Sequence, residues 1–208
     1  MAVLTLSRQY GAGGLEVGQQ LASRLGYDFL DSKLLDEVAR RLQVPETLVR
    51  TWDERREGLI LRLFRALQSA HPEYGAPAPL VGDTPTPDPD RVAEVVAEVI
   101  VEEARGQRAV IVGRGAAFAL RGAAGAHHFR LIAPRDARIA RVSQRLAISA
   151  EDAAKRVDQA DRDRLAWIRH HWNADAGDPI HYSLVINTAA VGIDSAVALI
   201  LRAAGLAV

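Results

Sequence analysis

Residues 2–25 restrict the fold of this chain more than any other stretch, because they combine a strand, a glycine-rich loop and a helix. Ala2 to Ser7 is a short apolar run with β-branched residues, suited to a buried parallel strand. After the loop RQYGAGG, apolar residues recur at helical spacing at Leu15, Val17, Leu21, Ala22 and Leu25. Such a loop presents backbone N–H groups and a helix N-terminus, both of which favour a phosphate. The sequence therefore predicts a nucleotide site.

Two phosphate-binding motifs compete for this loop, and the dinucleotide fingerprint G-x-G-x-x-G is the first. Gly11 and Gly13 fit it, and Asp31 lies at the distance expected of a ribose partner. Glu16, however, stands where the third glycine belongs. A dinucleotide-binding oxidoreductase is therefore a disfavoured alternative.

The second motif is the P-loop, G-x-x-x-x-G-K-[ST], and the spacing between strand and glycines suits this longer loop better. Its chemical groups are replaced. Arg8 stands at the first glycine, Gly14 at the lysine and Leu15 at the hydroxyl residue. The loop keeps the P-loop spacing and lacks the ammonium group.

Length and composition limit the number of domains and the kinds of ligand that the chain could bind. With 208 residues, of which 49% are hydrophobic, the chain can bury one sizeable core, so we expect a single domain over residues 1–208. Basic and acidic residues number 26 each, which gives no basic field for nucleic acid. Lys33 and Lys155 are the only lysines, so any phosphate chemistry depends on arginine, which binds phosphate in bidentate fashion.

Other site classes find little support in the sequence. There is no cysteine, and the histidines lack H-x-x-x-H spacing with a carboxylate, so we assign no metal-ligating residue. No uninterrupted apolar segment of about 18 residues occurs. We expect a soluble, cytoplasmic protein without membrane or nucleic-acid partners.

Strands alternate with helices along the chain, which predicts an α/β fold with a parallel, doubly wound sheet in a three-layer αβα sandwich. The predicted strands are residues 2–7, 26–31, 108–113, 127–133 and 182–188. The predicted helices begin near residues 15, 33, 44, 90, 134, 149 and 193. Ser149 is the expected N-cap of the helix that continues to residue 172.

Residues 44–89 differ from the rest. The segment 44–67 predicts an amphipathic helix that packs on the core or, through residues 52–68, forms a homodimer interface. Residues 71–89 hold most of the prolines and predict a long surface loop.

Charged residues gather where a ligand would bind in such a sheet, beyond the carboxyl ends of the strands. Arg8, Ser32 and Arg114 all follow predicted strands, and glycines flank Arg114. Asp161 and Arg164 share one face of the helix at 149–172. Arginines at these positions suit phosphoryl transfer, which depends on positioning and neutralising the transferred group.

Three segments together resemble the cytidylate-kinase-like family, relatives of bacterial cytidylate kinase within the P-loop nucleoside monophosphate kinases. They are LTLSRQYGAGGLEVGQQLASRLGYDFLD, VIVGRGAAFAL and YSLVINTAAVGIDSAVALI. The resemblance implies transfer of phosphate from ATP, with Mg²⁺, to CMP or dCMP. It also implies an acceptor-side insert at 44–89 and a lid at 148–172.

The resemblance implies roles for residues in these segments. Gly11, Ala12, Gly13 and Gly14 match the donor-phosphate loop; Ser32, Arg91 and Arg114 match acceptor-binding residues; and Asp161 and Arg164 match the lid's D-x-x-R. Because the P-loop lysine is missing, Arg8 is the nearest basic replacement and joins Asp161 and Arg164 as a catalytic candidate. The alternative is a nucleotide-binding pseudo-kinase with a degenerate P-loop and little phosphotransfer.

Overall fold

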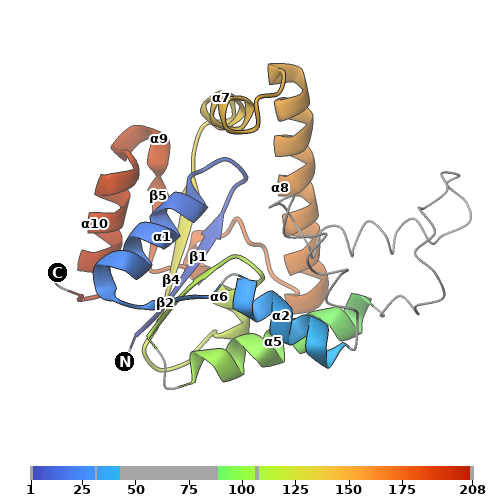
Figure 1. Ribbon diagram of the computed structural model, residues 1–208, viewed down its shortest axis with the longest axis vertical. Helices are drawn as coiled ribbons and strands as arrows, with labels where there is room; N and C mark the ends of the chain where they lie inside the picture. The colour runs from blue at the N-terminus through green and yellow to red at the C-terminus, as the bar shows by residue number, and fades with distance from the viewer. Residues whose placement is uncertain (1, 31, 43–88, 106–107, 207–208) are drawn as a thin grey trace, which may run out of the picture. The chain divides into compact units, whose positions relative to one another are not determined.

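The computed structural model describes residues 2–30, 32–42, 89–105 and 108–206 and contains one parallel sheet of five strands (Figure 1). The strands are β1 (Val3–Arg8), β2 (Asp28–Leu30), β3 (Ala109–Val112), β4 (Ala126–Ile132) and β5 (Leu184–Asn187). Their order in the sheet is β2-β3-β1-β4-β5, and every neighbouring pair is parallel. The predicted α/β class and doubly wound sheet are confirmed.

Helices follow the strands, as predicted. They are α1 (Gly14–Leu25), α2 (Ser32–Arg41), α5 (Pro89–Ala104), α6 (Ala116–Ala119), α7 (Arg135–Leu146), α8 (Ala150–Trp172), the 3₁₀ helix η1 (Pro179–His181), α9 (Thr188–Val191) and α10 (Ile193–Ala203). Among the described helices none has the length and apolar character needed to cross a membrane. The predicted helix at 44–67, the dimer surface at 52–68 and residues 71–88 lie outside the described part of the chain.

The chain divides into two compact units. One contains Met1–Asp31 and Ile100–Val208, and thus the whole sheet; the other contains Ser32–Val99. The acceptor-side insert predicted at 44–89 falls within the second unit, of which α2 and the first turns of α5 are described. The predicted single domain and its insert remain predictions.

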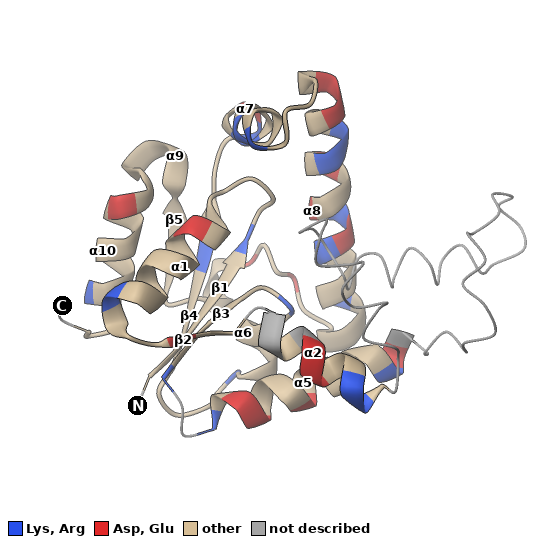
Figure 2. Cartoon of the chain, viewed as in Figure 1, with Lys and Arg blue, Asp and Glu red and all other residues tan. Residues whose placement is uncertain are grey.

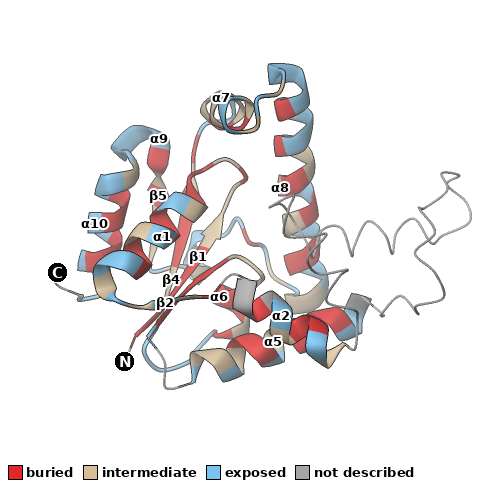
Figure 3. Cartoon of the chain, viewed as in Figure 1, coloured by how far each residue is buried: buried red, intermediate tan, exposed pale blue. Residues whose placement is uncertain are grey.

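The main core lies between one face of the sheet and helices α1 and α10 (Figure 3). Alternate residues of β1 and β4 supply it: Leu4, Leu6, Phe129 and Leu131 are completely buried. Burial of side chains of this size contributes about 1.5–3 kcal/mol each. This core fixes the end of β1 and the start of α1, the two elements that hold the glycine-rich loop.

The opposite face of β1 and β4 is polar, although strands of a parallel sheet are usually apolar on both faces. The Thr5 hydroxyl is hydrogen-bonded to Nδ1 of His128, at 2.8 Å. One step nearer the carboxyl ends, Ser7 pairs in register with Arg130. Polar groups therefore line the middle of the sheet as far as the loop.

Helices α7 and α8 form a pair joined by residues 147–149. Ser149 caps α8 as predicted, since its hydroxyl accepts a hydrogen bond from the N–H of Asp152 at 3.0 Å. A small apolar cluster joins the pair to Tyr10 of the loop; its members are Tyr10, Val142, Ala153, Val157 and Ala160. Basic and acidic residues are interspersed over residues 151–164 of α8, whereas the end of the helix is mostly uncharged (Figure 2).

The half-buried His128 predicts a pH-dependent stability. Burial lowers its pKa below the usual value near 6.5, so below that pH the unfolded chain binds the proton more readily than the folded one. The unfolding free energy of the wild type should therefore fall, relative to that of His128→Asn, as the pH drops below about 6.5. Urea denaturation between neutral and mildly acidic pH measures the difference, with His127→Asn on the other sheet face as control. Equal pH slopes for wild type and His128→Asn would contradict the prediction.

Candidate functional site: a phosphate-binding loop

The loop between β1 and α1 needs glycine at two positions. Gly11 and Gly13 both have φ of +80°, a conformation that side chains with a Cβ rarely adopt. A Cβ at Gly13 would also lie 2.4 Å from Cδ1 of Ile193. The glycines thus let the chain turn tightly beneath α10 and enter α1 at Gly14.

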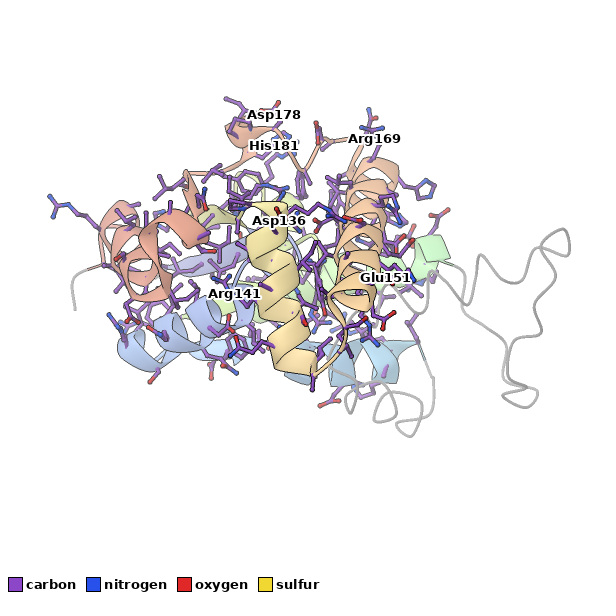
Figure 4. The ribbon with its side chains drawn as sticks, turned by 90° about the horizontal axis from the view of Figure 1, so that it is seen from above. Asp136, Arg141, Glu151, Arg169, Asp178 and His181 are labelled. Carbon is purple, nitrogen blue, oxygen red and sulfur yellow. The ribbon has the colours of Figure 1, made fainter. Side chains whose placement is uncertain are left out.

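Side chains from other elements hold the carbonyl groups of this loop. Arg138 Nη1 donates to Tyr10 O at 3.1 Å, Arg141 Nη1 to Gly11 O at 2.9 Å, and Thr188 Oγ1 to Ala12 O at 2.9 Å. Two of these donors are on α7 and the third begins α9; Figure 4 shows α7 crossing above the loop, with Arg141 on its α1 side. The loop is therefore fixed from outside.

With the carbonyls held, the amide groups remain for a ligand. Within the described residues, the N–H groups of Gly13, Gly14 and Leu15 have no hydrogen-bond acceptor. These N–H groups open α1 and project from its positive end. The geometry of these three amides is that of an anion cradle, while the N–H of Ala12 donates to the carbonyl of Gln9 at 3.2 Å. The donor-phosphate role of Gly11, Ala12, Gly13 and Gly14 remains a prediction.

The Arg8 side chain fills the space beside this cradle. A Cβ on Gly14 would lie 3.0 Å from Cγ of Arg8 and 3.2 Å from its Cδ. Farther along the side chain, a Cβ on Gly113 would lie 1.5 Å from Nη1 of Arg8. The aliphatic part of Arg8 thus occupies the volume that a side chain at Gly14 would take, and its guanidinium lies against Gly113, directly after β3.

Arg114 lies in a turn with unusual backbone geometry. Gly113, Arg114 and Gly115 have φ of +81°, +57° and +72°, and such a conformation is uncommon for an arginine. Trp172, at the end of α8, packs on Gly115 so closely that a Cβ there would lie 2.4 Å from the indole ring. The turn places Arg114 after β3, at the same edge of the sheet as the glycine-rich loop.

Asp161 and Arg164, predicted lid residues, both contact Tyr10 of the loop. The Asp161 carboxylate accepts from the N–H of Tyr10 at 2.8 Å and from the buried Arg138 at 2.5 Å. The guanidinium of Arg164 lies 5.3 Å from the centre of the Tyr10 ring. Burial raises the pKa of Asp161, while Arg138, Arg164 and Arg130 oppose that rise. Asp161 therefore fastens α8 to the loop.

Two predicted acceptor residues belong to the second unit. Ser32 begins α2, and its side chain lies outside the described part of the structure. Arg91 lies in the first turn of α5, half exposed, and pairs with Glu94 at 3.0 Å. Their acceptor roles remain predictions.

Sequence reasoning missed the residues that hold the loop in place. Arg138 and Arg141 lie one turn apart on α7, a spacing that was visible but is common on solvent-exposed helices. Arg130 gave a clearer signal, because it is a charged residue within the apolar run FRLIA. Thr188 gave none, since its partner Ala12 is 176 positions away.

The two carboxylates of α8 offer a matched test of this arrangement. Asp161→Asn removes the charge that compensates buried Arg138, so we expect a loss of about 2–4 kcal/mol in unfolding free energy. Asp158→Asn breaks the exposed pair with Arg135, also between α8 and α7, and should cost far less. Chemical denaturation compares them, and equal losses would show that Asp161 is not a buried structural charge.

The contact between Arg8 and Gly113 predicts non-additive stability. Gly113→Ala should be more destabilising than Gly122→Ala, since both residues have positive φ but only Gly113 faces Arg8, whereas nothing lies within 4 Å of a Cβ on Gly122. In an Arg8→Ala background the excess cost should shrink by about 0.5–3 kcal/mol, a range typical of contacting residues. A double-mutant cycle by chemical denaturation measures it. If the effects of the two substitutions on the unfolding free energy were simply additive, the contact between Arg8 and Gly113 would be contradicted.

Comparison with known proteins identifies the family and the fold of the chain. The model of the cytidylate kinase-like family matches residues 3–190. No protein with a curated description matches the sequence. Among solved structures, an uncharacterized protein from Eubacterium ventriosum has a TM-score of 0.71 at 18% identity and covers 99% of both chains.

Shikimate kinases share the fold more distantly. The enzyme from Bacteroides thetaiotaomicron has a TM-score of 0.53 at 16% identity, covering 99% of both chains. The enzyme from Acinetobacter baumannii, in complex with shikimate, has a TM-score of 0.50 at 17% identity, covering 97% of this chain and 92% of that one. Identities this low establish the fold alone, which is that of P-loop kinases. Since the family model spans most of the sequence, the chain belongs to the cytidylate kinase-like family.

Proposed function

We propose that this protein is a nucleoside monophosphate kinase that transfers the γ-phosphate of ATP to CMP or dCMP. The position of Arg8 carries the proposal. The P-loop lysine is absent at Gly14, yet the Arg8 side chain passes through the space beside Gly14 and delivers a permanent cation to the same edge of the sheet. The positive charge that is lost with the P-loop lysine is thus replaced by the positive charge of Arg8.

The donor phosphates bind at the cradle of Gly13, Gly14 and Leu15 amides, and the Arg8 guanidinium neutralises charge on the transferred phosphoryl group. An oxygen of the acceptor phosphate attacks the γ-phosphorus, the bond to the β–γ bridging oxygen breaks, and ADP leaves with the bond's electron pair. Fixed donors suit this reaction because its transition state is stabilised mainly by positioning and by neutralisation of charge.

Mg²⁺ is the ion that P-loop kinases generally use, and the first turn of α1 offers one oxygen ligand for it. Leu15 replaces the hydroxyl residue of the motif, but the exposed Glu16 has Oε2 3.3 Å from the position of a Cβ on Gly13. A carboxylate beside substrate phosphates is a usual Mg²⁺ environment, so Glu16 fits the ion. Bound Mg²⁺ would neutralise phosphate charge.

The remaining residues have acceptor and lid roles in the proposal. Arg114, Ser32 and Arg91 bind the acceptor, as the resemblance implies. Asp161 and Arg164 couple the lid to the loop through Tyr10, so that the loop and α8 stay aligned during transfer.

A second candidate is a nucleotide-binding pseudo-kinase, favoured by the replacement of both the lysine and the hydroxyl residue of the motif. Such a protein would bind nucleotide but would transfer no phosphate. An ADP-release assay with Mg-ATP, run with nucleotide-dependent thermal shifts, separates the two functions. Acceptors should include CMP, dCMP, UMP, AMP and GMP, and also shikimate because of the shikimate kinases of similar fold. The kinase proposal predicts turnover with CMP or dCMP of about 1–100 per second.

Substitution of Arg8 tests the proposed replacement of the lysine. Arg8→Met should lower kcat by about 10²–10³-fold, the usual effect of removing one transition-state donor. Arg8→Lys should retain more activity because it keeps a positive charge. Arg24→Met, an exposed arginine at the end of α1, should behave as wild type. Unchanged kcat in Arg8→Met would remove Arg8 from the mechanism.

A further inference from the structure

Arg130 on β4 is a buried cation with an unusual set of partners. The residue is only 8% exposed. Nη1 donates to the Ser7 hydroxyl at 3.2 Å and lies 3.5 Å from the Tyr182 hydroxyl, and the guanidinium lies 5.6 Å from the centre of the Tyr182 ring. All of these partners are neutral.

Within the described residues, no carboxylate lies within ion-pair distance of Arg130. A buried charge costs several kcal/mol unless an opposite charge compensates it. The hydroxyls, the aromatic face and the more distant Asp161 carboxylate, whose pKa Arg130 helps to lower, offset part of this cost. An anion beside Arg130 would supply the rest.

The free edge of the guanidinium indicates where such an anion would bind. Nη1 is engaged by Ser7 and Tyr182, while Nε and Nη2 donate to none of the described residues. Arg135 shows what this edge does when occupied: its Nε and Nη2 donate to the two carboxylate oxygens of Asp158, at 2.9 and 2.7 Å. Arg130 presents the same two-donor edge without its anion.

The neighbouring groups hold Arg130 in this orientation. Tyr182 donates to the carbonyl of Ala176 at 2.9 Å and lies 3.2 Å from the Ser7 hydroxyl. Its ring packs edge-on against Phe118 of α6. Ser7 immediately precedes Arg8 on β1, so the cluster lies at the base of the phosphate-binding loop.

From these contacts we infer that Arg130, with Ser7 and Tyr182, forms a subsite for a phosphate-sized oxyanion, separate from the amide cradle of α1. The Nε and Nη2 edge binds two of the anion's oxygens, and Ser7 and Tyr182 position the guanidinium. The inference rests on the proposed function only in identifying this anion as the phosphate of the acceptor.

Inorganic phosphate is the probe for this subsite. Calorimetric titration of phosphate into protein saturated with ADP reports binding outside the donor cradle. We expect Arg130→Met to weaken phosphate binding at least about tenfold and Arg130→Lys to weaken it less, with ADP affinity unchanged. Arg121→Met is the matched control, because Arg121 also lies over an aromatic ring, that of Phe118, but is exposed. It should bind phosphate as wild type does.

A site-specific readout on the wild-type protein keeps the test independent of the stability of the variants. In protein labelled with ¹⁵N-arginine, the Nε–H resonance that disappears in Arg130→Lys should shift and saturate when phosphate is added in the presence of ADP. A stationary Arg130 resonance, or equal phosphate affinity in Arg130→Met and wild type, would overturn the subsite. If ADP failed to bind, the proposed donor site would be wrong. A titration with phosphate alone, followed at the same Arg130 resonance, would then still show whether Arg130 binds phosphate.

Discussion

The site depends on hydrogen bonds that hold the carbonyl groups of the loop away from the ligand. A short glycine-rich loop can satisfy its own amides with its own carbonyls, and it would then bind nothing. Here Arg138, Arg141 and Thr188 occupy the carbonyls of three consecutive residues. The amides at the start of α1 are left for an anion as a result. Asp161 extends this control to α8, since the carboxylate that binds Tyr10 also compensates Arg138.

The elements of the fold could be predicted from the sequence because their signals are local. The alternation of apolar strands and amphipathic helices specified the sheet, and the glycines marked the loop and the turn around Arg114. The Ser149 cap was visible because both partners lie within four residues. The parallel sheet then placed the loop and Arg114 at one edge, as parallel strands must.

The contacts that make the loop a binding site were not predictable in the same way. Arg138 and Arg141 resemble the exposed arginines of any charged helix, and only the packing of α7 above the loop distinguishes them. Arg8 could be proposed from the sequence as a replacement cation, but its side chain could not be placed. Its position depends on Gly14 and on Gly113, which is 105 positions away. Because Gly113 has no side chain, it leaves room for the guanidinium. The environment of Arg130 joins three segments, β1, β4 and the chain after η1.

The route taken by Arg8 also bears on how such a loop could have diverged. A lysine introduced at position 14 would have its Cβ 3.0 Å from Cγ of Arg8, and a side chain at position 113 would meet the guanidinium. The strand-borne arginine and a helix-borne lysine therefore compete for one volume, and a chain that carried both would have to move the Arg8 side chain aside. We expect divergence of such a loop to exchange the two positions together, with arginine at the end of the first strand accompanied by glycine at the start of the helix.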